Sequence, residues 1–174
     1  MDKKEIAKRI YGVAHITGEF ILRSDQVSDE YFDKYLFEAE PELLIEIAKI
    51  MKSLIPVETE AIAGLEMGGI PVVTALSIET GIRSAFVRKK EKEYGTCKLA
   101  EGSCIENKNV CIIEDVVTTG GQIIESVKEL RKRGTKIDTV LCVILRDEKA
   151  INILANEGLK IVPAFTMEYI KEQI

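Results

Sequence analysis

The chain has 174 residues, a length that fits one domain and suffices to bury a hydrophobic core. Its 24 basic and 29 acidic side chains give a formal net charge of -5, which argues against a general nucleic-acid binder or a membrane-surface protein. The charged, amphipathic N-terminus lacks the apolar segment of a signal peptide, and no apolar run approaches the roughly 18 residues of a membrane span. We therefore expect a cytoplasmic protein that binds neither nucleic acid nor membrane.

Four cysteines, Cys97, Cys104, Cys111 and Cys142, and a single histidine, His15, limit the metal sites that the chain can form. No C-x-x-C pair occurs, so the pattern argues against a zinc site. Cys111 and Cys142 fall within apolar runs and are expected to be buried, which suits a reducing compartment without a structural disulfide. His15, near the end of the first predicted helix, is expected to be an ordinary surface or core histidine.

Helices are expected where apolar side chains recur at helical spacing and where Pro and Gly mark segment ends. The predicted helices are residues 2–16, 41–55, 68–81, 121–134, 148–158 and 166–174. The second of them illustrates the pattern, because Pro41 stands at its start and Leu43, Ile47 and Leu54 fall on one face.

Short apolar runs between these helices predict strands that alternate with them along the chain. The predicted strands are residues 61–64, 84–88, 110–114, 137–145 and 159–165. Such alternation implies right-handed crossovers and a mostly parallel sheet, and the runs VCII and VLCVIL indicate strands covered on both faces. Ligands of these sheets bind beyond the carboxyl ends of the strands. The segments at such ends are residues 64–70, 88–94, 114–122 and 145–148.

The most informative segment is NVCIIEDVVTTGGQIIES, residues 109–126, in which two acids and a Thr-Thr-Gly-Gly turn separate a strand from a helix. Consecutive backbone N–H groups, two hydroxyls and a helix N-terminus form an anion cradle, and glycine lets the backbone approach a phosphate closely. Acids beside the cradle suit a sugar phosphate, with Glu114 and Asp115 on ribose hydroxyls and the N–H groups on the phosphate. The residues alone leave a second interpretation open, a plain strand-to-helix turn with solvated acids.

A second polar segment, FVRKKEKEYGT at residues 86–96, begins at a strand end and carries a cluster of cations. The cluster consists of Arg88, Lys89, Lys90 and Lys92, and the polar stretch that follows is long for a loop in a compact domain. Taken alone, the pattern favours a solvated run of charges. Beside a phosphate-binding turn, it also fits a lid that binds a pyrophosphate leaving group and excludes water.

The segment EDVVTTGGQ resembles the phosphoribosyl-pyrophosphate (PRPP) signature of the type I phosphoribosyltransferases, and VRKKEKEYGT resembles the catalytic loop of the orotate phosphoribosyltransferases. Three further segments are similar to that family and follow in its order. They are the pyrophosphate loop IAGLEMGGIPVVTALS at 62–77, the orotate-covering region FILRSDQVSDEYFDKY at 20–35 and the orotate-binding strand end VILRDE at 143–148. The resemblance runs from about residue 20 to residue 165.

The resemblance implies roles for individual residues. Lys92 and Asp115 would carry the catalytic roles, with Glu114 and Asp115 on the ribose hydroxyls. The residues expected to contact PRPP are Arg88, Lys89, Lys92, Tyr94, Met67, Gly68, Glu114, Asp115, Val116, Val117, Thr118, Thr119, Gly120, Gly121 and Gln122. The residues expected to contact orotate are Arg23, Tyr31, Phe32, Thr118 and Arg146.

The same resemblance implies a fold and a reaction. The fold is α/β, the type I phosphoribosyltransferase fold, with a twisted, mostly parallel sheet flanked by helices and a small N-terminal hood. One domain is expected over residues 1–174, with the hood at 1–40, the α/β core at 41–174 and a lid loop at 88–109. The reaction is transfer of the 5-phosphoribosyl group from PRPP to orotate, with Mg²⁺ held mainly through PRPP and no direct protein ligand to the metal. The family also implies a homodimer that shares the lid across subunits.

Three positions depart from the family's pattern. Asp25 follows Ser24 where relatives usually have Ser-Gly, Leu145 precedes Arg146 where they commonly have Asp-Arg, and Gln122 replaces a frequent serine. None of these changes removes a central PRPP-binding group, so they bear on the base more than on PRPP. Two alternatives therefore stay open: a phosphoribosyltransferase for a purine base, and a non-catalytic PRPP-binding regulator on the same fold.

Overall fold

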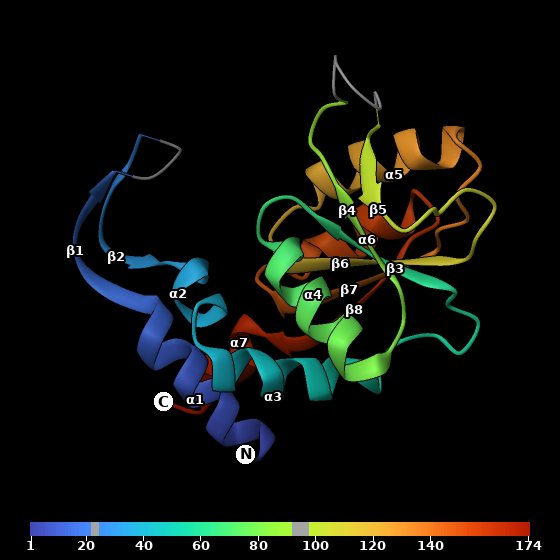
Figure 1. The fold of residues 1–174 in the computed structure, drawn as a ribbon. Coiled ribbons are helices and arrows are strands. Elements are labelled where there is room, and N and C mark those ends of the chain that lie inside the picture. Colours follow the sequence, from blue (N-terminus) through green and yellow to red (C-terminus); the bar gives the residue numbers. More distant parts are fainter. Residues whose placement is uncertain (22–24, 92–97) are drawn as a thin grey trace.

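The computed structural model describes residues 1–21, 25–91 and 98–174, and a six-stranded sheet forms its centre (Figure 1). The strands lie in the order β5-β4-β3-β6-β7-β8, and all neighbouring strands are parallel except β4 and β5. Their bounds are Ala61–Leu65 for β3, Ser84–Val87 for β4, Ala100–Gly102 for β5, Val110–Val117 for β6, Thr139–Leu145 for β7 and Lys160–Thr166 for β8. The predicted α/β architecture with a mostly parallel sheet is confirmed.

Hydrophobic side chains cover both faces of this sheet in two clusters. Along β6, Cys111 and Ile113 belong to the cluster on one face, whereas Val110 and Ile112 belong to the cluster on the other. Successive side chains of a strand point to opposite faces, so a strand buried on both sides is apolar at every position. The arrangement also buries the thiols of Cys111 and Cys142, as expected from the sequence.

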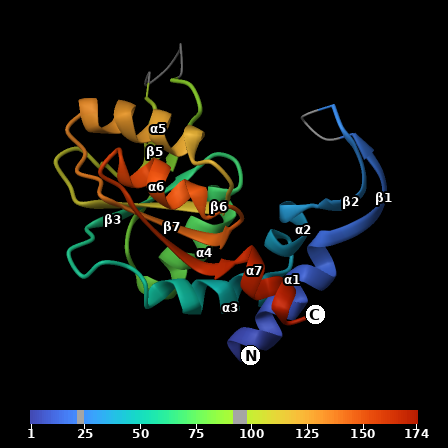
Figure 2. The same ribbon diagram turned by 180° about the vertical axis from the view of Figure 1, so that it is seen from behind.

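Helices pack against both faces (Figures 1 and 2). The cluster on one face includes side chains of α1, α3, α4 and α7, and the cluster on the other includes side chains of α5 and α6. Their bounds are Lys3–Ala14 for α1, Pro41–Lys52 for α3, Gly69–Thr80 for α4, Gly121–Lys132 for α5, Lys149–Ala155 for α6 and Met167–Glu172 for α7. Each predicted helix has its counterpart here. Within the described ranges, no helix has the length and apolar character needed to cross a membrane.

The N-terminal hood projects from the side of this core (Figures 1 and 2). Its strands β1 (His15–Ile21) and β2 (Val27–Phe32) form an antiparallel pair, and α2 (Lys34–Glu38) leads the chain back to the core. The first predicted helix is therefore too long by two residues, since α1 ends at Ala14 and His15 begins β1. The sequence does not predict the strand pair, because neither strand has a buried face that would impose alternating apolar residues.

Two further boundaries differ from the sequence-based expectation. The predicted strand ends at Glu114, but β6 continues through Val117, so Asp115 also lies inside the hydrogen-bonded strand. The strand end was misplaced because the two acids interrupt the apolar run. The polar segment after β4 also contains β5, which pairs with β4 at the edge of the sheet. This strand is three residues long, too short for a periodic pattern to reveal it.

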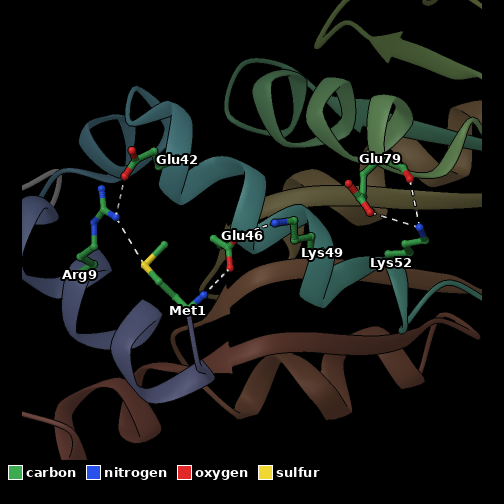
Figure 3. A network of polar contacts seen from close by, with 7 residues as sticks. All are labelled: Met1, Arg9, Glu42, Glu46, Lys49, Lys52 and Glu79. Carbon is green, nitrogen blue, oxygen red and sulfur yellow. Dashed lines mark hydrogen bonds and ion pairs between the residues drawn. The ribbon is translucent and has the colours of Figure 1, made fainter.

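Ion pairs connect the helices on one face of the molecule (Figure 3). The α-ammonium group of Met1 donates to Glu46 Oε2 at 2.9 Å, and this contact joins the start of the chain to α3. Lys52 Nζ lies 3.2 Å from Glu79 Oε1 and joins α3 to α4. Exposed pairs of this kind contribute only about 0–1 kcal/mol each, so the packed apolar faces provide most of the stability.

Candidate functional site

A cavity of about 330 Å³, called the first cavity below, lies at the carboxyl ends of β3 and β6. Its lining comes from the start of α2, the loop before α4, the segment after β4, and the end of β6 with the turn into α5. The lining residues are Lys34, Tyr35, Glu66, Met67, Gly68, Lys89, Glu114, Asp115, Val116, Val117, Thr118, Thr119, Gly120, Gly121, Gln122 and Ile123. Ligands of parallel sheets bind at this edge.

The turn between β6 and α5 has the form of an anion cradle. Gly120 has a φ of 78°, in the left-handed region that favours glycine, and Gly121 begins α5. A Cβ atom at position 120 would also lie 3.0 Å from Leu154 Cδ2. Because the N–H groups of a first helical turn lack intrahelical acceptors and the helix dipole favours negative charge, this turn can bind a phosphate.

Asp115 is fully buried and held in one orientation at the first cavity. The backbone N–H of Val116 donates to Asp115 Oδ1 at 2.5 Å, and Lys34 Nζ lies 2.6 Å from Asp115 Oδ2. The backbone N–H of Asp115 donates to Glu114 Oε1 at 3.1 Å. Both acids therefore accept a main-chain hydrogen bond, and Asp115 in addition pairs with a cation.

A third carboxyl group, that of Glu38 on α2, lies close to this pair. Burial, and then the interaction with Asp115, raise the pKa of Glu38 to about 9, so Glu38 is protonated at neutral pH. Burial and the charge of Asp115 also raise the pKa of Glu114 well above its usual value. For Asp115, burial opposes ionisation, but interactions with Glu114, Glu38 and Lys34 outweigh it and lower the pKa. The shifts therefore favour an ionised Asp115 beside the ammonium group of Lys34 and oppose ionisation of Glu38 and Glu114.

The loop before α4 contacts Asp115 through Gly68. A Cβ atom added to Gly68 would overlap the carboxylate of Asp115, so no residue with a side chain fits there without displacing it. The Glu66–Met67 peptide bond next to it is cis, and the residue Met67 is 60% exposed beside the cavity. The loop before α4 and the two acids thus form adjoining walls of the cavity.

The two cations that directly follow β4 lie in different places. The backbone N–H of Lys89 donates to Glu66 Oε1 at 2.5 Å, and Lys89 lines the first cavity. Arg88 does not line it, and its Nε instead lies 3.5 Å from Glu101 Oε1 next to it on β5. Lys89 is therefore the cation of this segment that the described residues place at the cavity.

A second cavity, of about 300 Å³, lies between the hood and the ends of β7 and β8. Its lining residues are Tyr11, His15, Ser28, Glu30, Tyr31, Phe32, Arg146, Met167 and Lys171. His15 Nε2 lies 2.7 Å from Glu30 Oε2, and the His15 ring stacks on that of Tyr11 with 4.5 Å between centroids. Aromatic rings beside a guanidinium group suit a flat, anionic ligand.

The predicted site residues fall into three groups. Of those expected to contact PRPP, the first cavity gathers Met67, Gly68, Lys89 and all of residues 114–122, and leaves Arg88 outside. Of those expected to contact orotate, the second cavity gathers Tyr31, Phe32 and Arg146, whereas Thr118 lines the first cavity. Arg23, Lys92 and Tyr94 lie outside the described residues, as does the segment 92–97 of the predicted lid.

Sequence reasoning missed five residues at or beside the first cavity: Lys34, Tyr35, Glu38, Glu66 and Ile123. Lys34 and Glu38 are one helical turn apart and share a face of α2, which is a signal that the sequence contains. The helix has only five residues, however, and too few apolar positions to be predicted. Glu66 directly precedes Met67, so the resemblance to a pyrophosphate loop pointed to its neighbour.

Comparisons with known proteins agree on one family. The model of the phosphoribosyl transferase domain family matches residues 37–168. An orotate phosphoribosyltransferase of Nocardioides sp. is 47% identical over 161 residues, which cover 92% of this chain and 90% of the relative. One of Methanocella arvoryzae is 39% identical over 144 residues, which cover 83% of this chain and 82% of the relative.

A solved structure extends the likeness to three dimensions. The orotate phosphoribosyltransferase of Mycobacterium tuberculosis matches this fold with a TM-score of 0.88 at 26% sequence identity, over 98% of this chain and 99% of that one. The signature at residues 114–122, the cavity that it lines and these matches lead to the same assignment. The chain belongs to the phosphoribosyltransferase family and, within it, to the orotate phosphoribosyltransferases.

Proposed function

We propose that the chain transfers the 5-phosphoribosyl group from PRPP to orotate, giving orotidine 5′-monophosphate and pyrophosphate, a step of pyrimidine nucleotide synthesis. The observation that carries the proposal is the first cavity, where the acids 114–115, the turn into α5 and the loop at Gly68 converge. Relatives named for this reaction, matched over most of the chain, support it.

PRPP suits the first cavity with its parts on different residues. The turn 116–122 takes the 5′-phosphate, because the N–H groups and the dipole of α5 favour an anion there. Glu114 and Asp115 take the ribose hydroxyls, and the pyrophosphate lies toward Gly68 and Lys89. With Asp115 paired to a cation and the pKa of Glu114 raised, the acids add little negative charge beside the phosphate. The acids and the anion cradle are therefore compatible.

Orotate suits the second cavity. Tyr31 and Phe32 offer ring faces to a planar base, and Arg146 offers a planar guanidinium group to the carboxylate or carbonyl oxygens of orotate. The backbone N–H of Arg146 donates to Val117 O at 2.8 Å. This hydrogen bond attaches the backbone of Arg146 to the strand end that leads into the turn 116–122.

The transfer needs no covalent intermediate on the protein. As pyrophosphate leaves, the ribosyl centre becomes oxocarbenium-like, and the carboxylate of Asp115 on the ribose favours that positive charge. Lys89 neutralises charge on the leaving pyrophosphate, and we expect Arg88 and Lys92 to contribute to the same task. Because Asp115 and Lys89 already line the cavity, they act without reorganising at the moment of bond cleavage.

We also propose Mg²⁺ as the cofactor, held mainly through oxygens of PRPP. Residues 1–21, 25–91 and 98–174 contain no group of three or more His, Cys, Asp or Glu side chains that could hold a metal ion. An ion that arrives on phosphate oxygens needs no such group, because Mg²⁺ commonly binds through substrate phosphates. When bound, it would neutralise part of the charge on pyrophosphate.

A homodimer is a further part of the proposal, and an apolar groove of about 470 Å³ between α3 and α4 supports it. Residues on its lining include Ile45, which is 50% exposed, and Ile78, which is 81% exposed. Continuous exposed apolar surface favours a protein partner, whereas isolated apolar side chains do not. Ile78→Lys should therefore lower the mass measured by light scattering from dimer to monomer. Ile151→Lys on α6, at a residue 43% exposed, is the control, and a wild-type monomer would contradict the dimer.

Pyrophosphate release with purified protein, PRPP and Mg²⁺ tests the reaction across a panel of orotate, uracil, adenine, guanine and hypoxanthine. Release with orotate alone is the expected result. Release with a purine base instead would identify a purine phosphoribosyltransferase. If none of the bases leads to pyrophosphate release, a non-catalytic PRPP-binding regulator is favoured. Asp115→Asn should weaken PRPP binding, and an unchanged PRPP affinity would refute the ribose assignment.

A further inference from the structure

We propose that Lys34 is a positioning residue of the ribose site, whose ammonium group fixes the orientation and the charge of the Asp115 carboxylate. The proposal rests on the function proposed above and adds a residue that the family resemblance does not mark. Lys34 is the first residue of α2 and lines the first cavity. Its Nζ lies 2.6 Å from Asp115 Oδ2, and the side chains of Lys34 and Asp115 are 33% and 0% exposed.

Contacts on both sides of Lys34 fix the start of α2 in place. The backbone N–H of Asp33 donates to Ala14 O at 2.8 Å, and Asp33 Oδ1 accepts from the N–H of Tyr35 at 3.1 Å. One turn further along, Phe37 is fully buried in the hydrophobic cluster shared with α1 and α3. The backbone that carries Lys34 is thus attached on both sides, so its side chain reaches Asp115 from a fixed point.

The need for a cation at this point follows from the charges around Asp115. The charged groups that interact with it are Lys34 and Glu38 of α2 and Glu114 of β6, while Glu66 and Lys89 line the same cavity. Three buried or half-buried carboxyl groups cannot all ionise at close range, so the one that contacts the cation keeps its charge. Lys34 contacts Asp115, and it thereby selects which carboxyl group is the anion.

The direction of each pKa agrees with this selection. The pKa values of Glu38 and Glu114 are raised, whereas that of Asp115 is lowered. Burial opposes the charge on Lys34 as well, but its interaction with Asp115 outweighs burial and raises its pKa. The shifts therefore favour the charged forms of Lys34 and Asp115 and the protonated forms of Glu38 and Glu114.

Lys34 and the main chain restrain the two oxygens of Asp115 separately. The backbone N–H of Val116 donates to Oδ1, and Lys34 Nζ forms its ion pair with Oδ2. The carboxylate is therefore held through both oxygens at the lining of the first cavity.

Lys34→Met tests the role through the pH dependence of PRPP affinity, measured by calorimetry and expressed as the ratio of the variant's dissociation constant to that of wild type. The ratio removes the titration of PRPP itself. Without the ammonium group, Asp115 takes up a proton more readily, and a protonated Asp115 loses its charge-assisted bonds to ribose. The ratio should exceed about ten at pH 6 and fall as the pH rises toward 9, by up to about tenfold per unit.

Two variants make the readout specific. Lys34→Arg keeps a cation and should bring the ratio close to one at every pH. Lys49→Met removes an ammonium group on α3, which pairs with Glu46 away from the first cavity, and should also give a ratio near one. A Lys34→Met ratio that stays near one, or that is raised equally at every pH, would overturn the positioning role, because neither result reports on the proton of Asp115.

A double-mutant cycle keeps the test valid if Lys34→Met folds poorly at neutral pH. In an Asp115→Asn background there is no carboxylate to position, so adding Lys34→Met should change PRPP affinity little. A loss of the same size in both backgrounds would overturn the proposal. Failure of the proposed function looks different, because wild type itself would then neither bind PRPP nor release pyrophosphate.

Discussion

The main chain at Gly68 lies directly against the carboxylate of Asp115. Gly68 belongs to the loop before α4, whereas Asp115 belongs to β6. A Cβ atom at position 68 would overlap that carboxylate. Asp115 has little freedom to move aside, since it is fully buried and held by Val116 and Lys34. The loop proposed to bind pyrophosphate and the acid proposed to bind ribose are therefore positioned by mutual contact.

Gly68→Ala should accordingly weaken PRPP binding, because the added methyl group must displace either the loop or the carboxylate. We expect a loss of at least about tenfold, which corresponds to a binding free energy of only about 1.4 kcal/mol. Calorimetric titration with PRPP measures the change. Gly12→Ala is the matched control, since a Cβ atom at position 12 meets nothing within 4 Å. If Gly68→Ala binds PRPP as tightly as wild type, the contact does not constrain the site.

Gly120→Ala should destabilise the fold as well as the phosphate turn. A non-glycine residue at a φ of 78° costs about 1–2 kcal/mol, and the new methyl group would also press on Leu154. Urea unfolding measures the loss. Gly121→Ala should cost less, because Gly121 opens α5 and its Cβ atom would meet only Thr119 Oγ1, at 4.0 Å. Equal stability of the two variants would contradict the role of the left-handed turn.

The protonated Glu38 predicts a stability that depends on pH. Its pKa is about 9 in the folded protein against an ordinary value of 4.5, so between these values the folded chain keeps a proton that the unfolded chain releases. The contribution of Glu38 to the free energy of unfolding is therefore fully present below pH 4.5, the ordinary pKa of a glutamate. It declines as the pH rises toward about 9, the pKa of Glu38 in the folded protein.

Glu38→Gln removes this titration and keeps a neutral side chain of similar shape. Relative to wild type, its free energy of unfolding in urea should increase between pH 5 and pH 8. Glu129→Gln, at a side chain 48% exposed on α5, is the control and should show no such trend. A difference between Glu38→Gln and wild type that is constant with pH would mean that Glu38 is ionised in the folded protein.

Lys92→Ala should reduce turnover by roughly two to three orders of magnitude while leaving the fold intact, as expected for loss of a cation that stabilises leaving charge. The prediction follows from the lysine-rich segment and its resemblance to a catalytic loop. Single-turnover pyrophosphate release measures the rate, and circular dichroism checks the fold. Lys128→Ala, which removes an exposed lysine of α5 paired with Glu157, is the control. Turnover like that of wild type would exclude Lys92 from the mechanism.

Periodicity was sufficient for most of the fold because most elements are covered on defined faces. The runs VCII in β6 and VLCVIL in β7 are apolar at every position because helices cover both faces of the sheet, so the sequence predicts both strands directly. The hood strands β1 and β2 have no buried side to impose a pattern, and β5 is too short for one. Those elements form through pairing with other segments, which local sequence does not encode.

The candidate site likewise has a part that the sequence predicts and a part that it does not. The cradle at residues 116–122 is contiguous, so its backbone chemistry is legible in the sequence itself. The contact between Lys34 and Asp115 joins segments far apart in the chain, and only the folded chain brings them together. A lysine at the start of a short helix is usually a solvated surface residue, and nothing local distinguishes this one.

The extension of β6 through Val117 has a consequence for where conformational entropy is lost. Glu114, Val116 and Val117 each face a residue of β7 in the sheet register, so the strand around the acids is ordered when the sheet forms. Ordering a residue's backbone opposes any process by about 1–2 kcal/mol at room temperature. Here that loss occurs on folding, so the main chain of the acids proposed to bind ribose is already ordered before PRPP binds.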